Sequence, residues 1–312
     1  MRFKAFCGVM MVRDEGRGVL AVAVGAALLG LSPLAVRLSE VDAQATNFWR
    51  FAFALPILGA LALGSSRPSR GETGLLLLAG LMFGLELGLW AAALSFTTVV
   101  NATLLSNLTP LVAAAFAWFI LRERIKGAAV LGAAVAMGGA VALTMARVGG
   151  SVGGGPDGPQ RLIGDALGFS SAFGYAGYLL IVRALGGRVR TGAIMFWATL
   201  SAAAFAFCAT LAVGQGFFPH SAKGWAILVG NGVLVQAAAQ GMIAYGVARL
   251  PIAISTVLLW LQPLSAAALS WMMFGEALTP LAFVGCALIL GGVWIVQRTR
   301  NAPPSTPQAE AP

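Results

Sequence analysis

Two ionisable side chains, Arg50 and Glu86, lie inside long apolar runs of the chain. A charged group at the centre of a bilayer costs roughly 2.5 to 3.5 kcal/mol on insertion scales, so each of these residues needs a partner or a function. Counted from the ends of their runs, both fall in the same half of a membrane. They can form a structural ion pair between two helices, or they can contact a zwitterionic or proton-coupled substrate.

Glu86 shares a helical face with Phe83 and Trp90, whereas three glycines spaced by four residues within 80–88 form a different face. The glycine face is suited to close packing against another helix. An acid beside aromatic rings can hold an ammonium group by charge and by cation–π attraction. The alternative is that Phe83 and Trp90 meet lipid while Glu86 pairs with Arg50.

Further polar side chains form stripes within apolar runs or lie beside prolines. Such stripes are expected to face the bundle interior, either as contacts between helices or as the wall of a cavity. Pro110 and Pro263 interrupt the helical hydrogen-bond ladder and are predicted hinges, although ordinary kinks would leave the same pattern. Together with Arg50, Phe83, Glu86 and Trp90, the candidate substrate-binding residues of a central cavity are Ser32, Asn101, Asn107, Tyr175, Tyr178, Gln236, Gln240 and Trp260.

The composition explains why these residues are few. Of 312 residues, 59% are hydrophobic and 10% are charged, where a soluble domain carries roughly a quarter charged. The net charge of +9 lies mainly in short connectors between apolar runs, which favours membrane orientation over nucleic-acid binding. A single histidine, no CxxC pair and no GxxxxGK[ST] motif predict no metal, no cofactor and no ATP hydrolysis by a Walker loop.

Ten apolar runs are each long enough to cross about 30 Å of hydrocarbon as a helix. The sequence therefore predicts an all-α integral membrane protein with a retained first helix. Most of the 20 lysines and arginines fall in alternate connectors, which places both ends of the chain in the cytoplasm and the protein in the cytoplasmic (inner) membrane. The runs are about 18–38, 45–64, 73–95, 98–121, 127–147, 163–183, 191–213, 224–247, 251–274 and 279–297.

The chain repeats itself at an offset of 153 residues. The segment NATLLSNLTPLVAAAFAWFILRE aligns with ISTVLLWLQPLSAAALSWMMFGE, so that Pro110 meets Pro263 and Trp118 meets Trp271. Since the repeat unit holds five helices, an odd number, the two copies must be inverted, as in alternating-access transporters. The predicted units are a first repeat at 1–148, a Gly/Pro-rich outer linker at 149–162, a second repeat at 163–298 and a disordered tail at 299–312.

The segment TLLSNLTPLVAAAFAWFILRERI, its echo in the ninth run, Arg50 within NFWRFAFALPIL and the two five-helix halves resemble the drug/metabolite transporter superfamily, EamA-type branch. The resemblance covers about residues 16–298, and within that branch the chain looks like a bacterial amino-acid exporter of the YddG kind. It implies a basket in which helices one to four and six to nine surround a cavity, with helices five and ten outside. One departure is that Arg50 has no basic counterpart in MFWATL of the seventh run.

These observations predict a secondary exporter of small metabolites, most plausibly aromatic or other neutral amino acids, that works by alternating access as a monomer or homodimer. Proton coupling through Glu86 is an option within this hypothesis. A transporter of drugs or sugar nucleotides, or an uptake protein, is the alternative. An integral membrane enzyme acting on lipid is disfavoured, because the acids are dispersed and histidine is nearly absent.

Overall fold

A computed structural model describes residues 2–65, 67–97, 102, 105–120, 122, 127–147, 159–214, 216–274 and 279–301. Within these ranges every regular element is a helix, which confirms the predicted all-helical class. Asn101, most of the predicted linker and the residues after Asn301 lie outside the described residues. The linker and tail boundaries shift where they can be seen: the helix after the linker begins at Pro159 and the last helix continues to Asn301. Proline suits the first turn of a helix because its missing N–H is not needed there.

The helices follow the predicted apolar runs closely. Seven of them, counting continuous segments, are long and apolar enough to cross a membrane, and three shorter apolar helices accompany them in the described chain. The elements are α1 (Arg2–Leu29), α2 (Leu31–Leu38), α3 (Ala43–Leu63), α4 (Arg70–Ala93), α6 (Thr109–Ile120), α7 (Gly127–Arg147), α8 (Pro159–Leu185), α9 (Thr191–Val213), α10 (Ala222–Gly230), η1 (Asn231–Ala239), α11 (Gln240–Val247), α12 (Ile252–Leu258), α13 (Leu261–Phe274) and α14 (Pro280–Asn301).

Polar side chains fix several helix starts. Asp42 accepts a hydrogen bond from the amide of Gln44 at the start of α3. Ser69 and Glu72 form a capping box at the start of α4, and Ser221 accepts from the amide of Gly224 at the start of α10. These bonds satisfy backbone donors that a helix leaves free in its first turn. These helix starts are therefore defined by local contacts.

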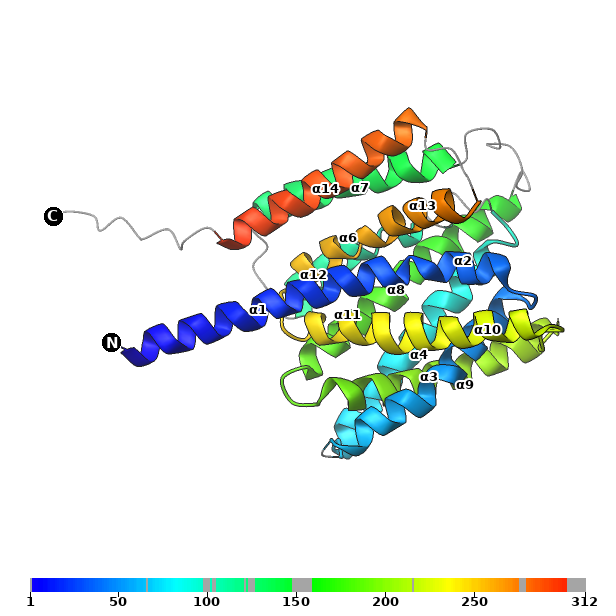
Figure 1. Cartoon of the computed structure of the whole chain (residues 1–312), viewed down its shortest axis with the longest axis horizontal. Helices are drawn as coiled ribbons and strands as arrows, with labels where there is room; N and C mark the ends of the chain where they lie inside the picture. Colours follow the sequence, from blue (N-terminus) through cyan, green and yellow to red (C-terminus); the bar gives the residue numbers. More distant parts are fainter. Residues whose placement is uncertain are drawn as a thin grey trace.

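Most helices run roughly along the long axis of the molecule, and α7 and α14 form a separate pair at one edge (Figure 1). The two helices are antiparallel and approach closely through glycines. A Cβ added at Gly132 would lie 2.8 Å from the carbonyl oxygen of Gly292, and one added at Gly139 would lie 2.6 Å from that of Gly285. This peripheral pair agrees with the expectation for helices five and ten.

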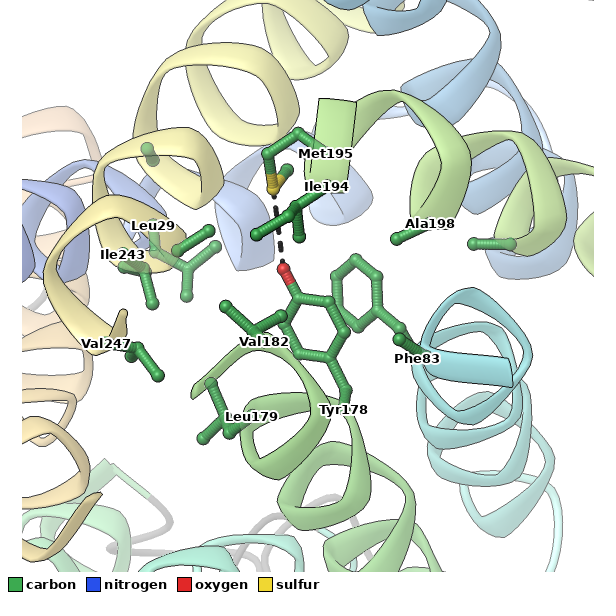
Figure 2. Close-up of a cluster of buried hydrophobic side chains, with 14 of the residues drawn as sticks. Leu29, Phe83, Tyr178, Leu179, Val182, Ile194, Met195, Ala198, Ile243 and Val247 are labelled. Carbon is green, nitrogen blue, oxygen red and sulfur yellow. Dashed lines mark hydrogen bonds between the residues drawn. The ribbon is translucent and has the colours of Figure 1, made fainter. Parts of the chain in front are cut away.

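Helices of the first half of the chain pack mainly against helices of the second half. Helix α4 packs on α8 and α9, and α6 also packs on α8. In the other direction, η1 packs on α1 and α3, and both α11 and α13 pack on α1. The main core lies where the halves meet. Figure 2 shows part of it, with Tyr178 of α8 between Phe83 of α4 and Met195 of α9.

Candidate functional site

Arg50 lies at the centre of a buried polar network. Its side chain is 2% exposed; Nε donates to Oε1 of Gln236 at 3.0 Å, and Nη1 donates to Oγ of Ser32 at 3.2 Å. Nε2 of Gln236 in turn donates to Oγ1 of Thr199 at 3.1 Å. All of these acceptors are neutral, so the network orients the guanidinium without neutralising its charge.

A structural ion pair between Arg50 and Glu86 is one of the two alternatives that the sequence leaves open. The charge of Arg50 acts on Glu86 electrostatically, but no salt bridge joins these two described residues. Gln236 and Ser32 accept from two of the five N–H donors of Arg50 instead. Glu86 accepts no hydrogen bond from the described residues. Its side chain is partly exposed.

Four aromatic and amide side chains continue the network. The guanidinium carbon of Arg50 lies 5.7 Å from the ring centroid of Phe83, and Phe83 stacks on Tyr178 with centroids 4.9 Å apart. Tyr175 stacks on Tyr178 at 5.8 Å and accepts a hydrogen bond from Nε2 of Gln240 at 3.2 Å. The alternative in which Phe83 meets lipid is wrong, because this side chain is 3% exposed. We call Arg50, Ser32, Gln236, Phe83, Tyr175, Tyr178 and Gln240 the central cluster.

Glycines bring α4 close to two neighbours. The face with Gly84 and Gly88 packs on Phe205 of α9, which confirms its predicted role in close packing. On the other side, a Cβ added at Gly174 of α8 would lie 3.1 Å from Cβ of Glu86. Glu86 is therefore held against α8 by an approach that only a glycine permits. Trp90, one turn further along α4, is half-buried.

The remaining candidates lie away from the central cluster. Trp260 is buried in a second core beside residues of α7 and α14, and its Nε1 has no hydrogen-bond partner; the same holds for Nδ2 of Asn107. Pro110 follows the turn before α6, and Pro263 follows the break between α12 and α13. The predicted helix breaks are therefore present at both prolines.

A cavity of about 540 Å³ opens where α3 ends and α9 begins. Its walls are mainly apolar side chains of α1, α3, α9, η1 and α11, and its mouth carries Ser65, Arg190 and Arg249. Met195 is part of the wall, and its sulfur accepts a hydrogen bond from the hydroxyl of Tyr178 at 3.5 Å (Figure 2). The cavity therefore ends against the central cluster.

The opposite ends of α3 and α9 are joined by contacts. Nε1 of Trp49 donates to the carbonyl oxygen of Phe217 at 2.8 Å, and their rings belong to a larger aromatic group. Nearby, Oε2 of Glu40 accepts from the amides of His220 at 2.8 Å and Ser221 at 3.0 Å. The Ser221 hydroxyl also donates to Glu40 and holds the pKa of that carboxyl below its usual value.

Comparison with known proteins agrees with this architecture. The EamA-like transporter family matches residues 16–145 and 162–298. The chain belongs to this family. It is 24% identical over 217 residues to the uncharacterized transporter YetK of Bacillus subtilis, covering 69% of this chain and 64% of that protein. It is 29% identical over 211 residues to a probable terminal-alkyne amino-acid exporter of Streptantibioticus cattleyicolor, covering 66% and 68%. A protein of known crystal structure shares the fold with a TM-score of 0.79 at 22% identity, covering 91% of this chain and 98% of that one.

The family and the names of these relatives point to a transporter of small molecules in a membrane rather than to an enzyme. The cavity is the functional feature that could not be predicted from the sequence. No predicted site residue lines it. Its walls include Met195, Ala238 and Met242, and such side chains do not stand out within an apolar run. Arg190 and Arg249 also line it, but in the sequence the basic residues of connectors indicate only the orientation in the membrane.

Proposed function

We propose that the protein is a secondary exporter of neutral amino acids that works by alternating access. The observation that carries this proposal is the cavity, which opens at one end of α3 and α9 and ends against the central cluster. An apolar wall suits the side chain of a neutral amino acid, and an oriented guanidinium suits its carboxylate. The name of the Streptantibioticus relative supports the same substrate class.

The proposed architecture has ten spans in two inverted repeats, at 1–148 and 163–298, joined by the outer linker 149–162. Pairs of contacts that exchange the halves support it. A Cβ added at Gly18 would lie 3.2 Å from Cγ of Leu250, and one added at Gly164 would lie 2.7 Å from Cβ of Thr97. Gly18 corresponds to Gly164 at an offset of 146, and Thr97 corresponds to Leu250 at an offset of 153. A contact that recurs with its partners exchanged is what a two-fold relation between the repeats produces.

The cavity mouth lies on the proposed cytoplasmic side. Arg190 and Arg249 flank it, and connectors rich in basic residues face the cytoplasm in multi-pass membrane proteins. On this orientation both ends of the chain are cytoplasmic, the protein lies in the inner membrane as a monomer or homodimer, and the structure faces inward. The contacts of Trp49 and Glu40 with the segment 217–221 then close the outer end.

The repeat also explains why Glu86 and Trp90 lie outside the cavity. At an offset of 152, which matches the helix caps Ser69 and Ser221, Glu86 corresponds to Ala238 and Trp90 to Met242. Both counterparts line the open cavity. When the repeats exchange conformations, Glu86 and Trp90 would line the outward cavity instead. An ammonium group would then meet an acid and an aromatic ring on its way out.

The proposed binding residues thus form three groups. The first is the central cluster, beside the inward cavity. The second is Glu86 and Trp90, with Glu86 as the carrier if protons drive export. Asn101, Asn107 and Trp260 are proposed to line the path beside the hinges Pro110 and Pro263, where the amide and indole N–H groups without protein partners could bind cargo.

The test is transport of a panel of labelled amino acids by the purified protein in liposomes, with and without a pH gradient. We expect accumulation of neutral amino acids, and we expect Glu86→Gln and Trp90→Ala to impair it. Trp294→Ala is the matched control, because Trp294 is 55% exposed on the peripheral helix α14. Full transport by both site variants would remove the site assignment, and no transport of any amino acid by the parent protein would remove the proposed function.

A further inference from the structure

Two connectors that correspond in the repeat carry opposite charges at two positions. Asp42 is the N-cap of α3 and Arg190 is the N-cap of α9. They align at an offset of 148, which also matches NFWR with MFWA. Two residues earlier, Glu40 stands in the first connector and Arg188 in the second. The repeat therefore places a carboxylate at one end of the bundle where it places a guanidinium at the other.

The helices α4 and α10, which correspond in the repeat, differ in the charge at their starts. Ser69 caps α4 and Ser221 caps α10, and both side chains accept a bond from the third residue after them in the chain. That third residue is Glu72 in α4 and Gly224 in α10. The first helix thus carries its own carboxylate at its start, and the second carries none.

The carboxylate of Glu40 occupies the start of α10 from the other half of the chain. It accepts the amides of His220 and Ser221, and a Cβ added at Gly224 would lie 2.6 Å from its Oε2. The absence of a side chain at Gly224 is what lets Glu40 approach. The free amides and positive dipole at the start of a helix favour a carboxylate there. This contact, the Glu40 latch, joins the two halves.

At the end where the cavity opens, Arg188 and Glu72 do not make the corresponding contact, although Nη1 of the neighbouring Arg190 donates to the carbonyl oxygen of Gly64. Oε2 of Glu72 accepts the amide and hydroxyl of Ser69 within its own helix, each at 2.8 Å. Arg188 is exposed and acts on Glu72 electrostatically, but no salt bridge joins these described residues. The cavity mouth, with Ser65, Arg190 and Thr191, lies between the same two connectors.

We propose that Arg188 and Glu72 form a second latch, which closes the cavity mouth when the Glu40 latch releases. The exchange of charge between the repeats keeps both contacts attractive, because Glu40 approaches a helix start that has no carboxylate of its own and Arg188 approaches one that a carboxylate already caps. In the present structure the Glu40 latch is made and the Arg188 latch is open. This inference rests on the proposed alternating access and names the charged residues that hold each of its two end states.

The test measures how open the cavity mouth is, independently of transport. In full-length protein with Cys7, Cys208 and Cys286 replaced by serine, Ala238→Cys places one thiol in the cavity wall. Its labelling rate by a polar maleimide reports the population of the inward-open state. We expect Glu40→Gln to lower the ratio of inward-open to outward-open protein about three- to tenfold, as follows from losing a modest net hydrogen-bond contribution, and thereby to slow labelling by up to that factor. Asp42→Asn is the control, since it keeps a capping side chain two residues away.

Charge reversal then separates the latch from a general effect of Glu40. Adding Arg188→Glu to Glu40→Gln places like charges at the mouth and should return labelling to the parent rate. Further addition of Glu72→Arg restores opposite charges and should slow labelling again. Equal labelling of Glu40→Gln and its parent, or no recovery with Arg188→Glu, would overturn the proposal. Transport by the parent protein with either of these results removes the latches alone, whereas a parent without transport removes the proposed function.

Discussion

Gly174 offers a test of how tightly α4 and α8 must approach to hold Glu86. In Gly174→Ala the new Cβ would lie 2.7 Å from the carbonyl oxygen of Met82 and 3.1 Å from the amide nitrogen of Glu86. Both neighbours are backbone atoms of α4, so no side-chain rotation can relieve the contact. The helices must separate, and such overpacking costs about 1 to 3 kcal/mol.

Gly177→Ala is the matched control, because it lies one turn further along α8 and faces the same Met82. There the added Cβ would lie 3.5 Å from Cγ of Met82, an ordinary contact. Each substitution gains a similar amount of helix propensity, about 1 kcal/mol. That gain cancels in the comparison, so the difference between the two variants measures the close approach itself.

The assay is thermal unfolding in detergent, followed by tryptophan fluorescence, together with uptake into liposomes. We expect Gly174→Ala to unfold a few degrees below Gly177→Ala and to transport less, since displacement of α4 moves Glu86. Equal midpoints for the two variants would refute the reasoning, because the clash would then have been absorbed without cost.

Three further predictions follow from other contacts. Gln236→Leu leaves Nε of Arg50 without its acceptor at 3.0 Å, so we expect about 1 to 3 kcal/mol of destabilisation by the same unfolding assay, and Arg50→Leu in this background should recover part of it. Gly139→Leu should separate α7 from α14, because a Cβ there would lie 2.6 Å from a backbone oxygen, whereas Gly138→Ala meets no atom and should be neutral in that assay. The pKa of Glu40 is lowered in the folded protein by the hydroxyl of Ser221, so the latch it forms is present above the usual carboxyl pKa and is lost as pH falls through the lowered one. Labelling of the cavity cysteine, corrected for maleimide reactivity with a free thiol, should fall at low pH, and Glu40→Gln should abolish that fall.

Helix positions could be predicted from the sequence because a membrane span has a required length and composition. The seventh run is an example: the prediction of 191–213 equals the bounds of α9. Interruptions within runs were harder to place. The break after Leu29 and the π-helical segment η1 depend on how the neighbouring helices pack, as at Gly30, where a Cβ would lie 2.8 Å from the amide of Ala266.

The central cluster could be predicted in part for a similar reason. Arg50, Gln236 and Tyr175 are conspicuous because a polar group in an apolar run needs partners, and the structure gives them partners from other helices. The identity of those partners could not be predicted. Gln236 and Glu86 were equally available to Arg50 in the sequence, and only the packing of η1 against α3 decides for the amide.

The separation of Glu86 and Trp90 from the open cavity follows from the proposed inverted repeat. Sequence reasoning selects polar and aromatic residues wherever they occur in the transport path, but one conformation opens the path at one end. The open end has Ala238 and Met242 at the corresponding positions, so its wall offers cargo no acid there, and its charged lining residues are Arg190 and Arg249. A substrate would therefore enter through an apolar wall, meet Arg50 beyond Met195, and reach Glu86 only after the opposite end opens. Loss of Glu86 should then impair release or coupling more than entry, which cavity labelling in the presence of substrate can separate from transport.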